Sequence, residues 1–181
     1  MRRLKRHLLE IDCELKNMAQ KEKSFEELTE EVIRERGYLA VLYFDLHAKS
    51  SEEVKNLMVG FVGKLTKEPG VAYAVGEIDQ PMEKGGIFST WAEVKLLVRD
   101  FPSLARISSL YSPIGVEISR PHEVKLNLGE AQKILLDSSQ ISQSFTRHIM
   151  EKVLSKDELA DYQKKMDSRA EIGRKLLEKK Q

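Results

Sequence analysis

The sequence lacks several features that would place the protein in a defined class at once. It has one cysteine, Cys13, among 181 residues, so no disulfide can form within a single chain. No apolar run approaches the roughly 18 residues that a membrane-spanning helix needs, and the first residues lack the apolar core of a secretory signal. With 30 basic and 29 acidic side chains the net charge is +1, so no overall field draws the chain to nucleic acid. We therefore expect a cytoplasmic protein without a membrane partner.

The sequence does contain enough apolar material for a folded core. Hydrophobic residues make up 41% and charged residues 33%, which is typical of one globular domain with helical extensions. The pattern changes after residues 37 and 121. We predict an N-terminal helical arm over 1–37, a central domain over 38–121 and a C-terminal helical extension over 122–181.

The N-terminal arm is predicted to form two helices. Its first apolar residues are spaced alternately by four and three: Leu4, Leu8, Ile11, Leu15 and Met18. This spacing draws one apolar seam along a helix, which we expect to dock on the body of the protein or on a second copy. Ser24 and Glu27 have the spacing of a capping box, and Gly37 is a typical helix terminator, so a second helix is predicted over 25–36.

The central domain is predicted to alternate strands and helices. The apolar run 38–46 predicts a strand, and Ser50 with Glu53 predicts the start of a helix that stops before Pro69 and Gly70. The remaining elements are a hairpin from 71 to 98 with its turn over 79–86, a helix over 101–111 and a strand over 116–119. This order is that of the ferredoxin-like βαββαβ fold, so we predict an α+β protein whose antiparallel sheet carries two helices on one face.

Two further patterns concern packing. Residues 122–128 alternate weakly and indicate a short fifth strand, followed by helices over 130–154 and from 155 onward. Gly60 and Gly63 lie within a helical stripe, and we interpret them as positions where a helix packs closely on the sheet.

The first predicted strand is apolar on both sides. Leu42 and Phe44 alternate with Val41 and Tyr43, so both faces of the sheet are apolar at this strand. Because large exposed apolar patches mark contact surfaces, a second protomer or the terminal helices should cover the second face. We predict a homodimer formed through the open sheet face and the helical arms.

Residue types that carry catalysis are present but scattered. The four histidines lie in separate predicted elements, without the paired His or Cys that a metal site needs. Asp45 and His47 alternate along the first strand and so point to one side, where a structural role is favoured over acid–base chemistry. We expect a non-catalytic ligand-sensing or protein-interaction protein with no metal and no cofactor.

Three short motifs resemble a known module. Pro69-Gly70-Val71 precedes the second predicted strand, Gly76-Glu77-Ile78-Asp79 ends it, and Val98-Arg99-Asp100 leads into the second helix. With these motifs, residues 39–121 resemble the effector-binding (RAM/ACT-like) domain of leucine-responsive, feast/famine type regulators. In that family a Gly-x-x-Asp turn borders a small-molecule pocket between paired protomers. The resemblance implies a small-molecule effector at Gly76 and Asp79, and we expect Asp45 and His47 to lie near it. The first 37 residues do not resemble a DNA-reading unit, so DNA regulation is not implied.

The same strand order also suits an RNA-recognition module. Lys84 and Phe88 match part of that module's sheet signature, and Tyr43 could supply a second ring from the first strand. The alternative function is therefore single-stranded RNA binding through Tyr43, Phe88 and Lys84. It is not favoured, because half of the signature is missing.

Overall fold

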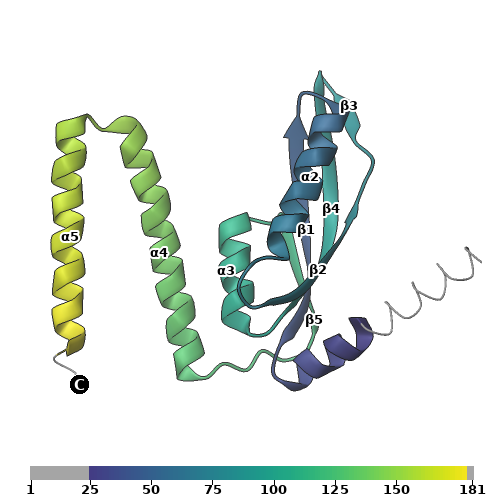
Figure 1. The fold of residues 1–181 in the computed structure, drawn as a ribbon, viewed down its shortest axis with the longest axis horizontal. Coiled ribbons are helices and arrows are strands. Elements are labelled where there is room, and N and C mark those ends of the chain that lie inside the picture. Colours follow the sequence, from purple (N-terminus) through teal and green to yellow (C-terminus); the bar gives the residue numbers. More distant parts are fainter. Residues whose placement is uncertain (1–24, 179–181) are drawn as a thin grey trace, which may run out of the picture. The chain divides into compact units, whose positions relative to one another are not determined.

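The computed structural model describes residues 25–178, which form two compact units that divide after Leu135. In the first unit a helix over residues 25–34 is followed by β1 (Tyr38–Ala48), α2 (Ser51–Leu65), β2 (Val71–Ile78), β3 (Met82–Lys84), β4 (Ile87–Val98), α3 (Phe101–Tyr111) and β5 (Gly115–Arg120) (Figure 1). Helix α4 (Leu128–Val153) begins in this unit and continues into the second, which also holds α5 (Lys156–Glu178). The predicted α+β class is confirmed.

The first unit is built on a five-stranded antiparallel sheet. Its strand order is β2-β4-β1-β5, and β3 pairs with β4. The longest pairing joins β1 to β4, from Tyr38 opposite Val98 to Ala48 opposite Phe88, without a register shift. Residues opposite each other in such a ladder point to the same face, so this register assigns every side chain of the two central strands to a face.

One face of the sheet carries the main core. Alternate residues of β1 and β4 pack with Met58 and Leu65 of α2 and with Leu104 and Ile107 of α3. The strand residues in this cluster are Tyr38, Ala40, Leu42, Phe44, Ala92, Val94, Leu96 and Val98. Helices α2 and α3 therefore cover the same face, and we call the opposite face the open face.

The helix over residues 25–34 covers one end of the open face. Its Phe25 ring lies edge-on to Tyr73 of β2 at 5.2 Å, and a 2.9 Å hydrogen bond joins the hydroxyls of Thr29 and Tyr73. The two terminal guanidinium nitrogens of Arg120, Nη1 and Nη2, donate to the Glu30 carboxylate at 2.6 and 3.1 Å. The chain itself thus covers this end of the second apolar face. The sequence predicted either a second protomer or the terminal helices as the cover, and at this end it is a terminal helix. The seam at residues 4–18 lies outside the described residues.

The same helix ends two residues earlier than predicted. It stops at residue 34, and Arg36 takes the left-handed conformation, with φ 74°. Gly37 lets the backbone pack closely against Val32 and β4, because a Cβ at this position would overlap Val32 and lie 2.6 Å from the carbonyl oxygen of Val98.

Three packing and boundary predictions were wrong. Gly60 and Gly63 have open space where a Cβ would be, because α2 turns its apolar stripe, not this side, toward the sheet. Residues 122–127 form no strand. The predicted turn over 79–86 contains β3, which makes a tight hairpin with β4 through Gly85 and Gly86, both at positive φ.

The second unit consists of two helices with little core. Within the described residues α4 has no buried side chain, and its Phe145 and Ile149 are 55% and 58% exposed. A cavity of about 390 Å³ between the two helices is lined mainly by polar side chains of α4, with Tyr162 and Met166 of α5. The predicted cap of α5 is confirmed: the Ser155 amide donates to the Glu158 carboxylate at 3.0 Å.

Candidate functional site

Two of the predicted site residues, Asp45 and Asp79, lie on either side of Trp91, at the end of the open face that the helix over residues 25–34 does not cover. Asp45 of β1 lies directly opposite Trp91 of β4. On the other side of β4, the Asp79 amide donates to the Trp91 carbonyl at 3.0 Å. Asp79 directly follows Ile78, the last residue of β2, which packs into the core, so continued alternation places Asp79 on the open face. One oxygen of its carboxylate accepts from the Gln80 amide at 2.9 Å. Asp45, Trp91 and Asp79 therefore form one row across β1, β4 and the residue that follows β2.

A hydrogen-bonded chain adjoins this row. His47 Nε2 lies 3.2 Å from Asp45 Oδ2, and His47 Nδ1 lies 2.8 Å from the hydroxyl of Ser89, its partner on β4. The prediction that Asp45 and His47 point to one side is confirmed. Although Asp, His and Ser also occur in hydrolase triads, the His47 and Asp45 side chains are 59% and 44% exposed here. The bonds orient the imidazole at a wet surface.

More carboxylates continue along the open face toward its centre. Tyr43 lies opposite Glu93, which lies opposite Glu77, and Val41 lies opposite Glu117. Partial burial, together with the charges of Glu93 and Glu117, raises the pKa of Tyr43. We call Asp45, Glu77, Asp79, Glu93 and Glu117 the acidic group. Lys95 lies among them, whereas Arg120, at the far end, is paired with Glu30.

This arrangement suits a positively charged ligand. Trp91 is 42% exposed, and an indole face attracts an ammonium or guanidinium group through its negative π face. Carboxylates on both sides supply hydrogen-bond acceptors and opposite charge. A phosphate at the same position would meet the acidic group instead.

The other predicted site residues do not join this row. Gly76 faces the core, where a Cβ would lie 3.1 Å from both Val62 methyl groups of α2. Its small size therefore admits α2, not a ligand on the open face.

The residues of the RNA alternative are also separated. Tyr43 points to the open face, whereas Phe88 has the opposite parity on β4 and points to the helix-covered side. Lys84, at the end of β3, lies opposite Ile87. Trp91, not Phe88, lies on the open face with Tyr43, and Tyr73 lies on the same face beneath the helix over residues 25–34.

Sequence reasoning missed Trp91 and Ser89 as site residues. The signal was present in the alternation of side chains along the second hairpin strand: Val94, Leu96 and Val98 share one face, so the odd-numbered residues point to the other. The register that sets them opposite Asp45 and His47 could not be read from the sequence, because β3 alters the connection before β4.

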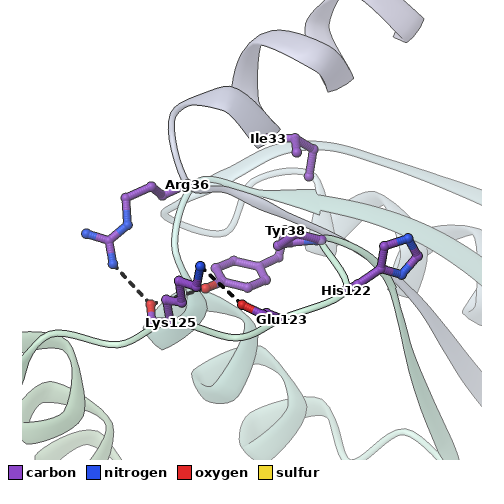
Figure 2. Close-up of a pocket in the computed structure, with 7 residues that line it drawn as sticks. Ile33, Arg36, Tyr38, His122, Glu123 and Lys125 are labelled. Carbon is purple, nitrogen blue, oxygen red and sulfur yellow. Dashed lines mark hydrogen bonds and ion pairs between the residues drawn. The ribbon is translucent and has the colours of Figure 1, made fainter.

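A cavity lies beside Tyr38, away from the row at Trp91. A cavity of about 380 Å³ is lined by Ile33, Arg36, Tyr38, Pro121, His122, Glu123 and Lys125. Figure 2 shows Arg36 and His122 on opposite sides of the Tyr38 ring. Two of its cations already have acidic partners: Arg36 lies 3.5 Å from the Glu130 carboxylate, and the Lys125 ammonium lies 3.1 Å from Glu123. Arg36 also donates to the Lys125 carbonyl at 3.0 Å. These pairs leave the cavity less suited to a charged ligand than the row at Trp91.

The described part of the chain offers neither a metal cluster nor a membrane span. Over residues 25–178 no group of three or more His, Cys, Asp or Glu side chains is placed to hold a metal ion. Within the same range, every helix is too short or too polar to cross a bilayer.

The fold and site define an α+β protein with a partly covered sheet and an acidic, aromatic patch on its open face. The model of the MJ0538 family matches residues 39–174, most of the chain, so the protein belongs to the MJ0538 family. The match runs from the second residue of β1 through β5 and continues into α5. Searches of curated proteins and of solved structures found no match.

Proposed function

We propose that this protein is a non-catalytic binding module whose open face takes a ligand carrying an ammonium or guanidinium group. The observation that carries the proposal is the row Asp45, Trp91 and Asp79, in which an exposed indole lies between two carboxylates. The ligand can be a small amine or the lysine and arginine side chains of a partner protein. Both present the same chemistry to the row.

We also propose that the sheet with α2 and α3 is a ferredoxin-like module. Support comes from the strand order β2-β4-β1-β5, with β3 as an addition, and from two helices packed on one face. This is the arrangement expected from two split βαβ units. In such a module the uncovered face is available for binding, which agrees with the position of the row.

Isothermal titration calorimetry on the full chain tests the binding proposal. The probes are spermidine, an oligo-lysine peptide and an oligo-uridine RNA of similar length. We expect one or both cationic probes to bind and the RNA not to bind, and we expect the affinity to fall as salt rises because exposed charges are screened. Spermidine binding alone identifies a small amine as the ligand, and peptide binding alone identifies a protein partner.

Paired substitutions locate the site. Asp45→Asn with Asp79→Asn should weaken binding by about tenfold or more, equivalent to about 1.4 kcal/mol. The control is Glu123→Gln, which removes an exposed carboxylate paired with Lys125 beside the Tyr38 cavity, and it should leave the affinity unchanged. Equal affinity in the double variant and the wild type, or tight binding of the RNA, would contradict the proposal.

A further inference from the structure

We propose that residues 1–24 of the same chain bind across the open face beside Trp91 and compete there with the cationic ligand. The competition rests on the proposed function, whereas the binding of the segment to the face does not. Four features argue for this occupant: the place where the segment enters the structure, its charge, its apolar seam and its length.

The segment joins the described structure on the open face. Phe25, the first described residue, contacts Tyr73 there, and the following helix stays on that face as far as the Glu30–Arg120 pair. The chain before Phe25 therefore starts at the edge of the surface that it is proposed to cover.

The charges of the two surfaces are complementary. Residues 1–24 hold an excess of basic side chains: Arg2, Arg3, Lys5, Arg6, Lys16, Lys21 and Lys23, against Glu10, Asp12, Glu14 and Glu22. The open face carries the acidic group, with Lys95 among it. A second copy of the face would bring carboxylates against carboxylates and repel at neutral pH, so the basic segment is the better match.

The apolar residues and the dimensions also agree. Trp91 and Val75 are 42% and 45% exposed on this face, and the segment offers the seam from Leu4 to Met18. As a helix, 24 residues span about 36 Å, and an 11-residue strand such as β1 spans about 36 Å. The segment is therefore long enough to follow the strands from end to end.

Quenching of Trp91 fluorescence by acrylamide tests the inference without any ligand. Trp91 is the single tryptophan of the chain, so the signal reports on this face alone. We expect quenching to increase in the full-length variant Arg2→Ala, Arg3→Ala, Lys5→Ala, Arg6→Ala, and in a second variant, Leu8→Asp with Leu15→Asp. The control variant removes four basic residues of α5 (Lys164→Ala, Lys165→Ala, Arg169→Ala and Lys175→Ala) and should quench like the wild type.

Affinity for the cationic probe measures the competition. If the segment leaves the face free about a tenth of the time, the variants should bind the probe about tenfold more tightly than the wild type. Increased quenching without probe binding would support the segment's position and overturn the proposed ligand. Unchanged quenching in both variants overturns the inference. Protection of Trp91 that depends on protein concentration also overturns it, because a second copy would then cover the face.

Discussion

Gly37 and Gly60 are the same residue type in opposite surroundings, and they allow a direct test of the packing described above. A methyl group at Gly37 would overlap Val32 and approach the Val98 carbonyl, whereas Gly60 faces open space on α2. Gly37→Ala should lower the free energy of unfolding by about 1–3 kcal/mol through overpacking. Gly60→Ala should raise it by about 0.5–1 kcal/mol, because alanine favours a helix interior.

Urea unfolding of the two variants beside the wild type measures both changes. Equal effects at the two positions would show that the Gly37 backbone moves away from Val32 at little cost. A destabilising Gly60→Ala would restore the close-packing interpretation that the sequence suggested for Gly60 and Gly63.

The orientation or role of some single residues could be predicted from the sequence, and that of others could not. The shared side of Asp45 and His47 follows from strand alternation and was predictable. The role of Gly76 was not, because a small residue can admit either a ligand or a neighbouring helix, and here Val62 of α2 occupies the space. Trp91 was not predicted as a site residue because its importance depends on cross-strand neighbours.

Between elements, Glu68 joins the end of α3 to the loop between α2 and β2. The Tyr111 hydroxyl donates to one oxygen of Glu68 at 2.7 Å, and Arg106 lies 2.9 Å from the other. The hydrogen bond from Tyr111, together with Arg106, holds the pKa of Glu68 below its usual value of 4.5. Burial and the Glu68 carboxylate raise the pKa of Tyr111 to about 12.

Tyr111→Phe removes this contact and should lower the free energy of unfolding at pH 7 by about 1 kcal/mol, as expected for a partly exposed, charge-assisted hydrogen bond. The folded-state pKa of Glu68 is lowered, so its contribution is present above pH 4.5 and is lost as pH falls through the lower folded value. The difference between variant and wild type should therefore shrink in acid.

Urea titrations of both proteins at pH 7 and near pH 3 check this prediction. The pKa of Tyr111 is raised in the folded protein, so its hydrogen bond should also contribute fully to the stability of the wild type below pH 10. This contribution should be lost as the pH rises from 10 toward 12. A difference of the same size at pH 7 and in acid would mean that the Tyr111 hydroxyl stabilises the fold independently of the Glu68 charge, because phenylalanine keeps the ring that packs on Phe61 at 5.4 Å.

The elements themselves were largely readable from local signals. Strand β1 and helix α2 begin where the apolar run and the Ser50 cap predicted, with Ser50 accepting from the Glu53 amide at 3.2 Å. The start of α4 was missed by two residues because its cap is the reciprocal pair Asn127 and Glu130. The short strand β3 has too few residues to show a period.

At the scale of the whole molecule, burial is concentrated in the sheet unit. Strand β4 is paired on both sides, and its Val94, Leu96 and Leu97 are fully buried, whereas α4 has no buried side chain in the described residues. Amide hydrogen exchange, followed by mass spectrometry, should therefore be slowest in β1 and β4 and fastest in α5 and the second half of α4. Protection of α4 equal to that of β4 would show that another surface covers Phe145 and Ile149.

The homodimer predicted from the sequence stays a prediction, but the open sheet face assigned to it carries the acidic group. Its apolar strand was evident in the sequence, whereas the gathering of the acidic group required the register of four strands. Light scattering at pH 7 should find no association through this face, and Glu93→Gln with Glu117→Gln should not weaken any dimer that forms. Dissociation of a dimer by these substitutions would place the carboxylates in its interface.

The indole N–H resonance of Trp91 tests the central claim most directly, because the chain has one tryptophan and the resonance is therefore unique. In a titration of ¹⁵N-labelled full-length protein with the oligo-lysine peptide or spermidine, we predict that this resonance shifts and saturates. In the Asp45→Asn, Asp79→Asn variant it should stay in place. A stationary indole resonance, with shifts confined to the residues around the Tyr38 cavity, would contradict the account and assign binding to that cavity.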